Sequence, residues 1–163
     1  MSREGMERMA GTWLQTFNSG EFSQMMDLTT PGASFVADDS DDELLDEAFG
    51  HFEARDDPSY TIVSSGGDIV KTSQLVKRNT PNLIGTLINE WIIDEDQQTV
   101  AGQVNWSRPE EPDLPAAQGR LLFRLSPDSS KIQSMRDQHE AIIRNGRGRC
   151  PCCEPLGPEL PRP

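Results

Sequence analysis

The sequence predicts an α+β fold with helices packed on one face of a curved antiparallel sheet. Apolar residues recur at helical spacing in the first half of the chain. Four long segments with strand character then follow between residues 83 and 139. Helices followed by a run of strands are typical of α+β architecture. A length of 163 residues suits one domain with a single core, followed by a tail.

The N-terminal segment predicts two helices and a short strand. Met6, Met9, Trp13 and Phe17 recur at the spacing of one helix face, and the turn residues 18–20 end this pattern. A second, short helix is expected over residues 22–28. A strand is expected over residues 33–38.

The middle of the chain predicts two further helices. Ser40 or Asp41 caps the first, whose apolar positions lie within residues 44–52. A strand is expected over residues 60–63, and a turn at residues 66–67. Asp68 then caps a helix over residues 69–76.

Strands are expected over residues 83–93, 99–106, 119–125 and 131–139, separated by segments rich in turn residues. In the last strand, Met135, Asp137 and His139 share one face because strand side chains alternate. If this face borders an apolar cavity, desolvation raises the pKa of the aspartate, and the pair becomes suited to proton transfer. The alternative is that both side chains meet water, paired with Arg120 or Arg124.

The charge balance argues against some partners. The chain has 15 Lys and Arg against 27 Asp and Glu, a formal net charge of -12, which repels nucleic-acid phosphates and anionic membranes. It has no apolar run near the ~20 residues that cross a bilayer and no secretory signal, so a soluble, cytoplasmic protein is expected.

Residues 144–163 predict a flexible tail rich in Pro, Arg and Cys. Its Cys150, Cys152 and Cys153 are too close together to link distant parts of a fold. A structural zinc site normally takes four ligands, and this cluster has neither a second cysteine pair nor a nearby histidine. Exposed thiols are the simpler interpretation, and no metal site is expected.

Three segments resemble the nuclear transport factor 2-like superfamily. Residues 13–22 (WLQTFNSGEF) resemble the helix ending that opens these domains, and residues 67–91 match a helix and first long strand in spacing. Residues 123–125 (FRL) and 131–136 (KIQSMR) resemble the terminal hairpin. The resemblance implies a cone-shaped sheet over residues 1–143, with the helices on its concave face. It also makes residues 40–58 an insertion, with a helix over about 40–57, that could act as a lid.

The same resemblance implies a pocket inside the cone. SnoaL-like polyketide cyclases carry an acid/base aspartate where this chain has Asp137, and ketosteroid isomerases carry their general base near Asp38. Trp13 and Leu121 replace the oxyanion-binding residues of ketosteroid isomerases, which argues against steroid isomerisation. The implied catalytic residues are Asp137, His139 and Asp38. The implied substrate-binding residues are Trp13, Phe17, Asn89, Trp91, Val104, Trp106, Leu121, Phe123 and Met135.

The expected function is a cofactor-independent acid/base enzyme, a cyclase, isomerase or dehydratase. Its substrate would be a small hydrophobic, polyketide- or terpenoid-like metabolite. The alternative is a non-catalytic binding or dimerisation module of the same fold. A homodimer fits both, because Ile84, Ile88, Ile92 and Leu122 lie on the strand faces opposite the pocket. A cavity of at least ~300 Å³ favours the enzyme, and an interior filled by its own side chains favours the module.

Overall fold

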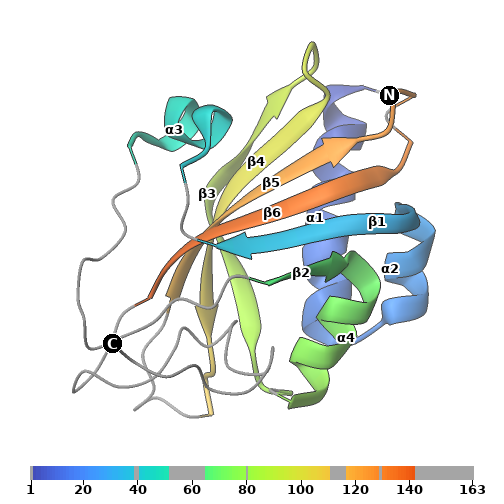
Figure 1. The fold of residues 1–163 in the computed structure, drawn as a ribbon, viewed down its shortest axis with the longest axis vertical. Helices are drawn as coiled ribbons and strands as arrows, with labels where there is room; N and C mark the ends of the chain where they lie inside the picture. Colours follow the sequence, from blue (N-terminus) through green and yellow to red (C-terminus); the bar gives the residue numbers. More distant parts are fainter. Residues whose placement is uncertain are drawn as a thin grey trace.

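The computed structural model describes residues 2–38, 41–51, 65–79, 81–110, 117–128 and 130–141. Four helices and a six-stranded sheet make up this part of the chain (Figure 1). The helices are α1 (Arg3–Ser19), α2 (Phe22–Leu28), α3 (Glu43–Phe49) and α4 (Ile69–Asn79). The strands are β1 (Thr29–Asp38), β2 (Ser65–Asp68), β3 (Ile84–Asp94), β4 (Thr99–Ser107), β5 (Ala117–Leu125) and β6 (Ile132–Ala141).

The ends of α1 follow from local chemistry. The Ser2 hydroxyl accepts a hydrogen bond from the backbone N–H of Gly5 at 3.1 Å, which caps the first turn. Gly20 ends the helix in the left-handed conformation at φ 76°, which glycine adopts without a Cβ penalty. Asn18 joins α1 to β3, since its side chain both donates to the Gly85 carbonyl and accepts from the Gly85 N–H.

The sheet has the order β2-β1-β6-β5-β4-β3. Consecutive strands from β3 to β6 pair antiparallel, as the sequence predicts. β1 pairs parallel with β6, so the sheet is mixed, and the antiparallel order expected from the sequence holds for β3 to β6 but not for this pair. The helical and loop segments between β1 and β6 leave the chain free to return in either direction, and no local pattern encodes that choice.

The main core lies between α1 and the inner face of the sheet, the face that carries Val100, Val104, Leu121 and Phe123. Helix α1 crosses behind the long strands, while α2 and α4 close the end of the molecule near β1 and β2 (Figure 1). Alternation along β4 and β5 sends one set of side chains into this core and the other set outward. This arrangement confirms the α+β fold with helices on the inner face.

Helix α3 packs on the opposite, outer face of the sheet. Its Leu45 is fully buried against Ala101 of β4 and Leu122 of β5. Because these residues alternate with the inner set, α3 is separated from the inner core by the sheet itself. The sequence analysis considered the insertion as a lid over the pocket. Its helix α3 instead packs on the outer face and does not cover the inner core.

Several predicted elements differ at their bounds. β1 begins four residues before the predicted strand 33–38, and β2 occupies the expected turn at residues 66–67. Asp68 caps α4 as predicted, because its Oδ1 accepts the backbone N–H of Lys71 at 2.9 Å. The predicted strand over 60–63 and the tail 144–163 lie outside the described residues. In the described part of the chain, no helix has the length and apolar character to span a membrane.

Candidate functional site

Asp137 is buried in the interior of the fold. It lies on β6 between Leu121 of β5 and Ala37 of β1, and only 2% of its surface is exposed. Met135, two residues earlier, is buried on the same face. The alternation read from the sequence therefore does point this carboxylate inward, and the water-exposed alternative is wrong for Asp137.

Two tryptophans and Phe17 form an aromatic wall beside this carboxylate. Trp13 stacks on Phe17 with ring centroids 5.9 Å apart, and Trp106 meets Phe17 edge-on at 5.2 Å. Both indoles are about as buried as Asp137. In the part of the chain that the structure describes, neither indole N–H meets a hydrogen-bond acceptor. Buried donors without acceptors are uncommon and costly, so these two groups call for an explanation.

Gly119 of β5 provides the space in which the carboxylate and one indole meet. A Cβ atom at this position would lie 2.5 Å from Oδ1 of Asp137 and 2.8 Å from Nε1 of Trp106. Both polar atoms therefore occupy the region directly above this glycine. An acid and a neutral donor are held together there against an apolar wall.

The cavity beside these groups, termed here the inner cavity, is small and mainly apolar. Its volume is about 30 Å³, which is close to the share of one water molecule in the liquid. It is lined by Trp13, Phe17, Phe35, Ala37, Thr72, Ser73, Val76, Leu83, Trp106, Met135 and Asp137. The interior is thus nearly filled by its own side chains, short of the ~300 Å³ that a ligand pocket normally needs.

No family model and no curated protein match the sequence. Solved structures do match. A protein of unknown function with a cystatin-like fold from Methylobium petroleophilum has a TM-score of 0.61 at 14% identity, covering 91% of this chain and 84% of that chain. A provisionally assigned ketosteroid isomerase from Kribbella flavida has a TM-score of 0.54 at 13% identity, covering 97% and 91%. A provisionally assigned isomerase of the SnoaL-like family from Agrobacterium tumefaciens has a TM-score of 0.52 at 10% identity, covering 83% and 97%.

The chain has the nuclear transport factor 2-like fold. At identities of 10–14%, these similarities establish the architecture and leave the chemistry to the residues of this chain. The resemblance read from the terminal hairpin and the first helix is confirmed at the level of the fold.

The nuclear transport factor 2-like fold brings five of the expected site residues together around the inner cavity: Trp13, Phe17, Trp106, Met135 and Asp137. Four other expected residues are buried in the core but do not line this cavity: Trp91, Val104, Leu121 and Phe123. Trp91 instead packs edge-on against Phe123 at 5.8 Å and covers Gly102. The three tryptophans therefore do not share one cavity.

Asn89 lies away from the site. The pairing of β3 with β4 shifts register between Ile88 and Ile92, and Asn89 has a φ of 67° in this irregular stretch. An irregularity of this kind breaks the two-residue period and redirects side chains. Asn89 is consequently exposed, although strict alternation from Trp91 pointed it inward.

Two expected catalytic residues are described only through their backbone. His139 lies opposite Gly119 in the β5–β6 pairing, and Asp38 lies opposite Gln138 in the β1–β6 pairing. Their side chains fall outside the described residues. The backbone register keeps both residues within two positions of Asp137 or its pairing partner.

The sequence interpretation missed the contributions of β1 and α4. Phe35 and Ala37 line the inner cavity because β1 runs parallel to β6, opposite Met135 and Asp137. Their alternation within residues 33–38 was the available signal, but it identifies the cavity only once the strand pairing is known. The α4 face made by Thr72, Ser73 and Val76 had no distinguishing pattern.

Lys77 of α4 lies next to the wall of the inner cavity. Its Nζ donates a hydrogen bond to the Leu83 carbonyl at 2.8 Å and lies 5.2 Å from the centre of the Phe17 ring. Desolvation by burial lowers the pKa of this amine below its usual value. The contacts link α4 to the start of β3 beside two residues that line the cavity.

The described residues include one group of possible metal ligands, on the opposite face of the sheet from Asp137. Ligand atoms of Asp41, Asp46 and His51 all lie within 4.8 Å of one another. This group belongs to the α3 segment on the outer face, and Asp41 and His51 are exposed. The Arg120 guanidinium lies 3.9 Å from the Asp46 carboxylate, so a positive charge is already present at this group.

Proposed function

We propose that this chain is a cofactor-independent acid/base enzyme that isomerises, cyclises or dehydrates a small, largely apolar metabolite. The observation that carries the proposal is the buried carboxylate of Asp137 sharing the space above Gly119 with the indole N–H of Trp106. An apolar environment disfavours the charged form of a carboxyl group and so favours proton exchange near neutral pH. Such a group is suited to act as a general base and then as a general acid.

The residues around Asp137 have complementary roles in this proposal. Asp137 removes a proton from the substrate and returns it at a second position. The Trp106 N–H donates a hydrogen bond to the substrate oxygen that gains negative charge, and a preorganised donor in a dry site stabilises such charge strongly. Trp13 and Phe17 hold the apolar part of the substrate in orientation. His139 is proposed as the proton partner of Asp137.

The similar folds support the reaction class. Two of the similar structures are provisionally assigned as a ketosteroid isomerase and as an isomerase of the SnoaL-like family. A polyketide- or terpenoid-like substrate and a homodimer are part of the proposal. The dimer is supported by Ile84 of β3, which is 36% exposed on the edge strand.

The volume of the inner cavity favours a second candidate, a non-catalytic module of the same fold. A cavity of about 30 Å³ admits a substrate only if its walls move. The walls contributed by β1 and α4, including Phe35 and Val76, are at the end of the sheet where β2 is the edge strand. In the enzyme, these elements separate from Trp13 and Trp106 when substrate enters. In the module, they stay closed.

The two candidates differ in proton exchange. β,γ-Unsaturated alicyclic ketones in D₂O, followed by proton NMR, report proton removal next to a carbonyl group. In the enzyme, Asp137→Asn lowers the exchange rate by about 10²- to 10⁴-fold, and Trp106→Phe lowers it by about 10- to 10³-fold. Asp94→Asn, an exposed carboxylate on the outer side, is the matched control and leaves the rate unchanged. The module would be favoured if the wild-type chain exchanged protons no faster than buffer alone. It would also be favoured if Asp137→Asn exchanged them as fast as the wild type.

A further inference from the structure

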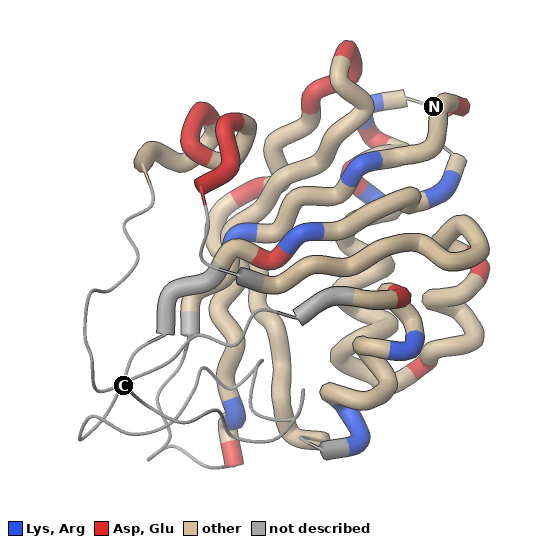
Figure 2. Tube along the Cα trace, in the orientation of Figure 1, with Lys and Arg blue, Asp and Glu red and all other residues tan. Residues whose placement is uncertain are grey.

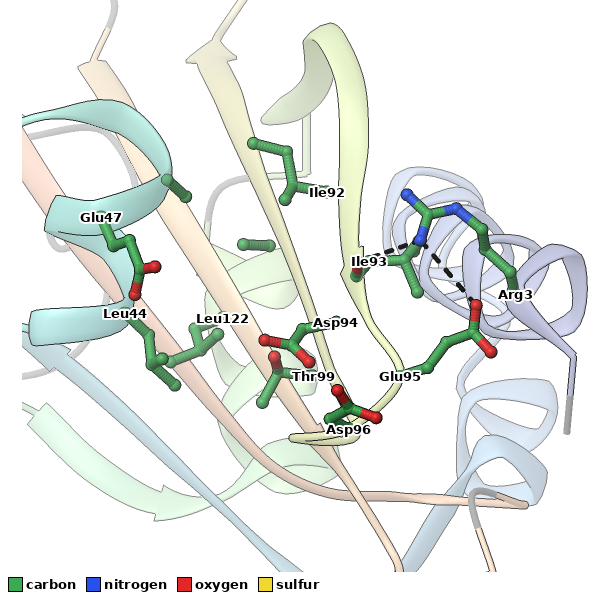
Figure 3. A pocket seen from close by; sticks show the side chains of 12 residues that line it. Arg3, Leu44, Glu47, Ile92, Ile93, Asp94, Glu95, Asp96, Thr99 and Leu122 are labelled. Carbon is green, nitrogen blue, oxygen red and sulfur yellow. Dashed lines mark hydrogen bonds and ion pairs between the residues drawn. The ribbon is translucent and has the colours of Figure 1, made fainter.

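A second concavity lies on the outer face of the sheet, between α3 and strands β3 and β4 (Figure 3). Its volume is about 690 Å³, more than twenty times that of the inner cavity. Its floor is aliphatic and is made by Leu44, Ala48, Ile92, Ala101 and Leu122. Its rim carries Arg3, Glu47, Asp94, Glu95 and Asp96. We call this concavity the acidic groove.

The carboxylates of the rim are only partly balanced by nearby cations. The Arg3 guanidinium lies 3.9 Å from the Glu95 carboxylate and donates to the Ile93 carbonyl at 3.2 Å, as the dashed lines in Figure 3 mark. Within the described ranges, no cation lies within salt-bridge distance of Glu47, Asp94 or Asp96. Figure 2 shows acidic residues in red on α3 and at the tip of the β3–β4 hairpin. The groove therefore has a net negative rim above an apolar floor.

This combination matches the side chains of lysine and arginine. Both carry an aliphatic stem that packs on apolar surface and a cationic head that pairs with carboxylates. The stem would pack on Leu44, Ala48 and Ile92, the floor residues that keep exposed surface, and the head would lie between the acids of the rim. The net charge of -12 adds a long-range field that attracts basic partners.

Other occupants fit the groove less well. A second copy of this chain would bring a like-charged rim against this one, and opposed carboxylates repel. A single divalent cation needs several ligand atoms close together, but the one converging group among the described residues is Asp41, Asp46 and His51, outside the rim. The acidic rim and aliphatic floor of the groove thus favour a basic segment of a partner protein.

We propose that the acidic groove binds a segment of a partner protein in which arginine or lysine alternates with aliphatic residues. The basic heads pair with Glu47, Asp94 and Asp96, and the aliphatic side chains contact the exposed Ile92 and the partly buried Leu44. The site is independent of the proton chemistry at Asp137, because the sheet separates the two. Binding therefore does not require the inner cavity to open.

The test measures fluorescence anisotropy of a fluorescein-labelled heptapeptide in which arginine and leucine alternate, added to the full chain at low ionic strength. A matched peptide carries citrulline, the neutral isostere of arginine. The groove variant combines Glu47→Gln, Asp94→Asn and Asp96→Asn. The control variant combines Glu7→Gln on α1, Glu21→Gln just before α2 and Asp27→Asn on α2, which removes the same charge from exposed positions. Circular dichroism confirms that both variants are folded.

The proposal predicts that the groove variant binds the arginine peptide about tenfold or more weakly than the control variant does, because it loses charge-assisted contacts. Ile92→Ser weakens binding as well, and the citrulline peptide does not bind. Equal binding by the groove and control variants would show attraction by net charge alone and would overturn the proposal. Two other results would also overturn the proposal. One is self-association of the chain, measured by sedimentation, that the groove variant abolishes. The other is calcium binding to the groove that displaces the peptide.

Discussion

The two faces of the sheet place neighbouring charged residues of β6 in different environments. Asp137 points inward and is buried among the aromatic residues of the inner cavity. Arg136, one position earlier, points outward and lies 3.3 Å from the carboxylate of Asp42, at the start of α3. At this point the outer face pairs a cation with a carboxylate at a partly exposed surface, whereas the inner face holds a carboxyl group where water is nearly excluded. A single strand can thus serve both a structural and a chemical role.

Phe123→Ala is the largest test of this difference. Phe123 is fully buried between Trp13 and Trp91 on the inner face, and its truncation is expected to lower the free energy of unfolding by about 3–5 kcal/mol. Ile92→Ala on the outer face removes a side chain that is 41% exposed and should cost under about 1 kcal/mol. Urea denaturation measures both. Similar losses would mean that the outer face is as tightly packed as the inner face.

Gly119→Ala tests the close approach of Asp137 and Trp106. The new Cβ would overlap the carboxylate oxygen and the indole nitrogen, so one or both side chains must move. Overpacking of this kind costs about 1–3 kcal/mol in the free energy of unfolding. It also abolishes proton exchange in the enzyme, because the two groups lose their alignment. A variant with unchanged stability and exchange would contradict the geometry above Gly119.

Arg136→Met tests the attachment of α3 to the outer face. The substitution removes the pair with Asp42, whose Oδ1 also caps α3 by accepting the backbone N–H groups of Leu44 and Leu45. The pair is partly exposed, so the expected loss is about 1 kcal/mol or less. Arg124→Met, an exposed arginine on β5, is the control and should change stability by under about 0.5 kcal/mol. Faster amide hydrogen exchange confined to α3 would identify the local cause.

Lys77→Met gives the smallest and most pH-dependent effect. Burial lowers the pKa of Lys77 in the folded chain, while the unfolded chain keeps a value near 10.5. Between these two values, the unfolded state binds more protons, so this lysine makes the wild type more stable as the pH rises. The stability difference between wild type and Lys77→Met should therefore shift in favour of the wild type toward pH 10.5. A difference that is constant with pH would contradict the burial of this amine.

The sequence was most informative where the repeat of one helix or strand decides the direction of its side chains. The alternation of Met135 and Asp137 predicted which strand face they share, and the helical spacing of Trp13 and Phe17 predicted that they lie on one face of a helix. Both predictions depend only on the geometry of one element. Asn89 shows the limit, because the irregular pairing of β3 with β4 interrupted the period from which its direction was read.

Contacts between distant segments were less predictable. Nothing local indicates that β1 runs parallel to β6, and this pairing brings Phe35 and Ala37 to the inner cavity. Nothing local indicates that α3 lies on the outer face, where Arg120 donates to the carbonyls of Phe49 and Gly50 at its C-terminal end. Amphipathic helices specify that they need an apolar surface, but not which of several surfaces they cover.

The amino-acid sequence alone determined the α+β class, the order of the helices and long strands, and the strand face that Asp137 shares with Met135. These follow from periodicity and turn chemistry, which act over a few residues. Only the tertiary structure decided the parallel pair, the position of α3, the near-complete filling of the inner cavity and the presence of the acidic groove. Those features depend on how side chains from separate elements fill shared space, and that packing is a property of the whole chain.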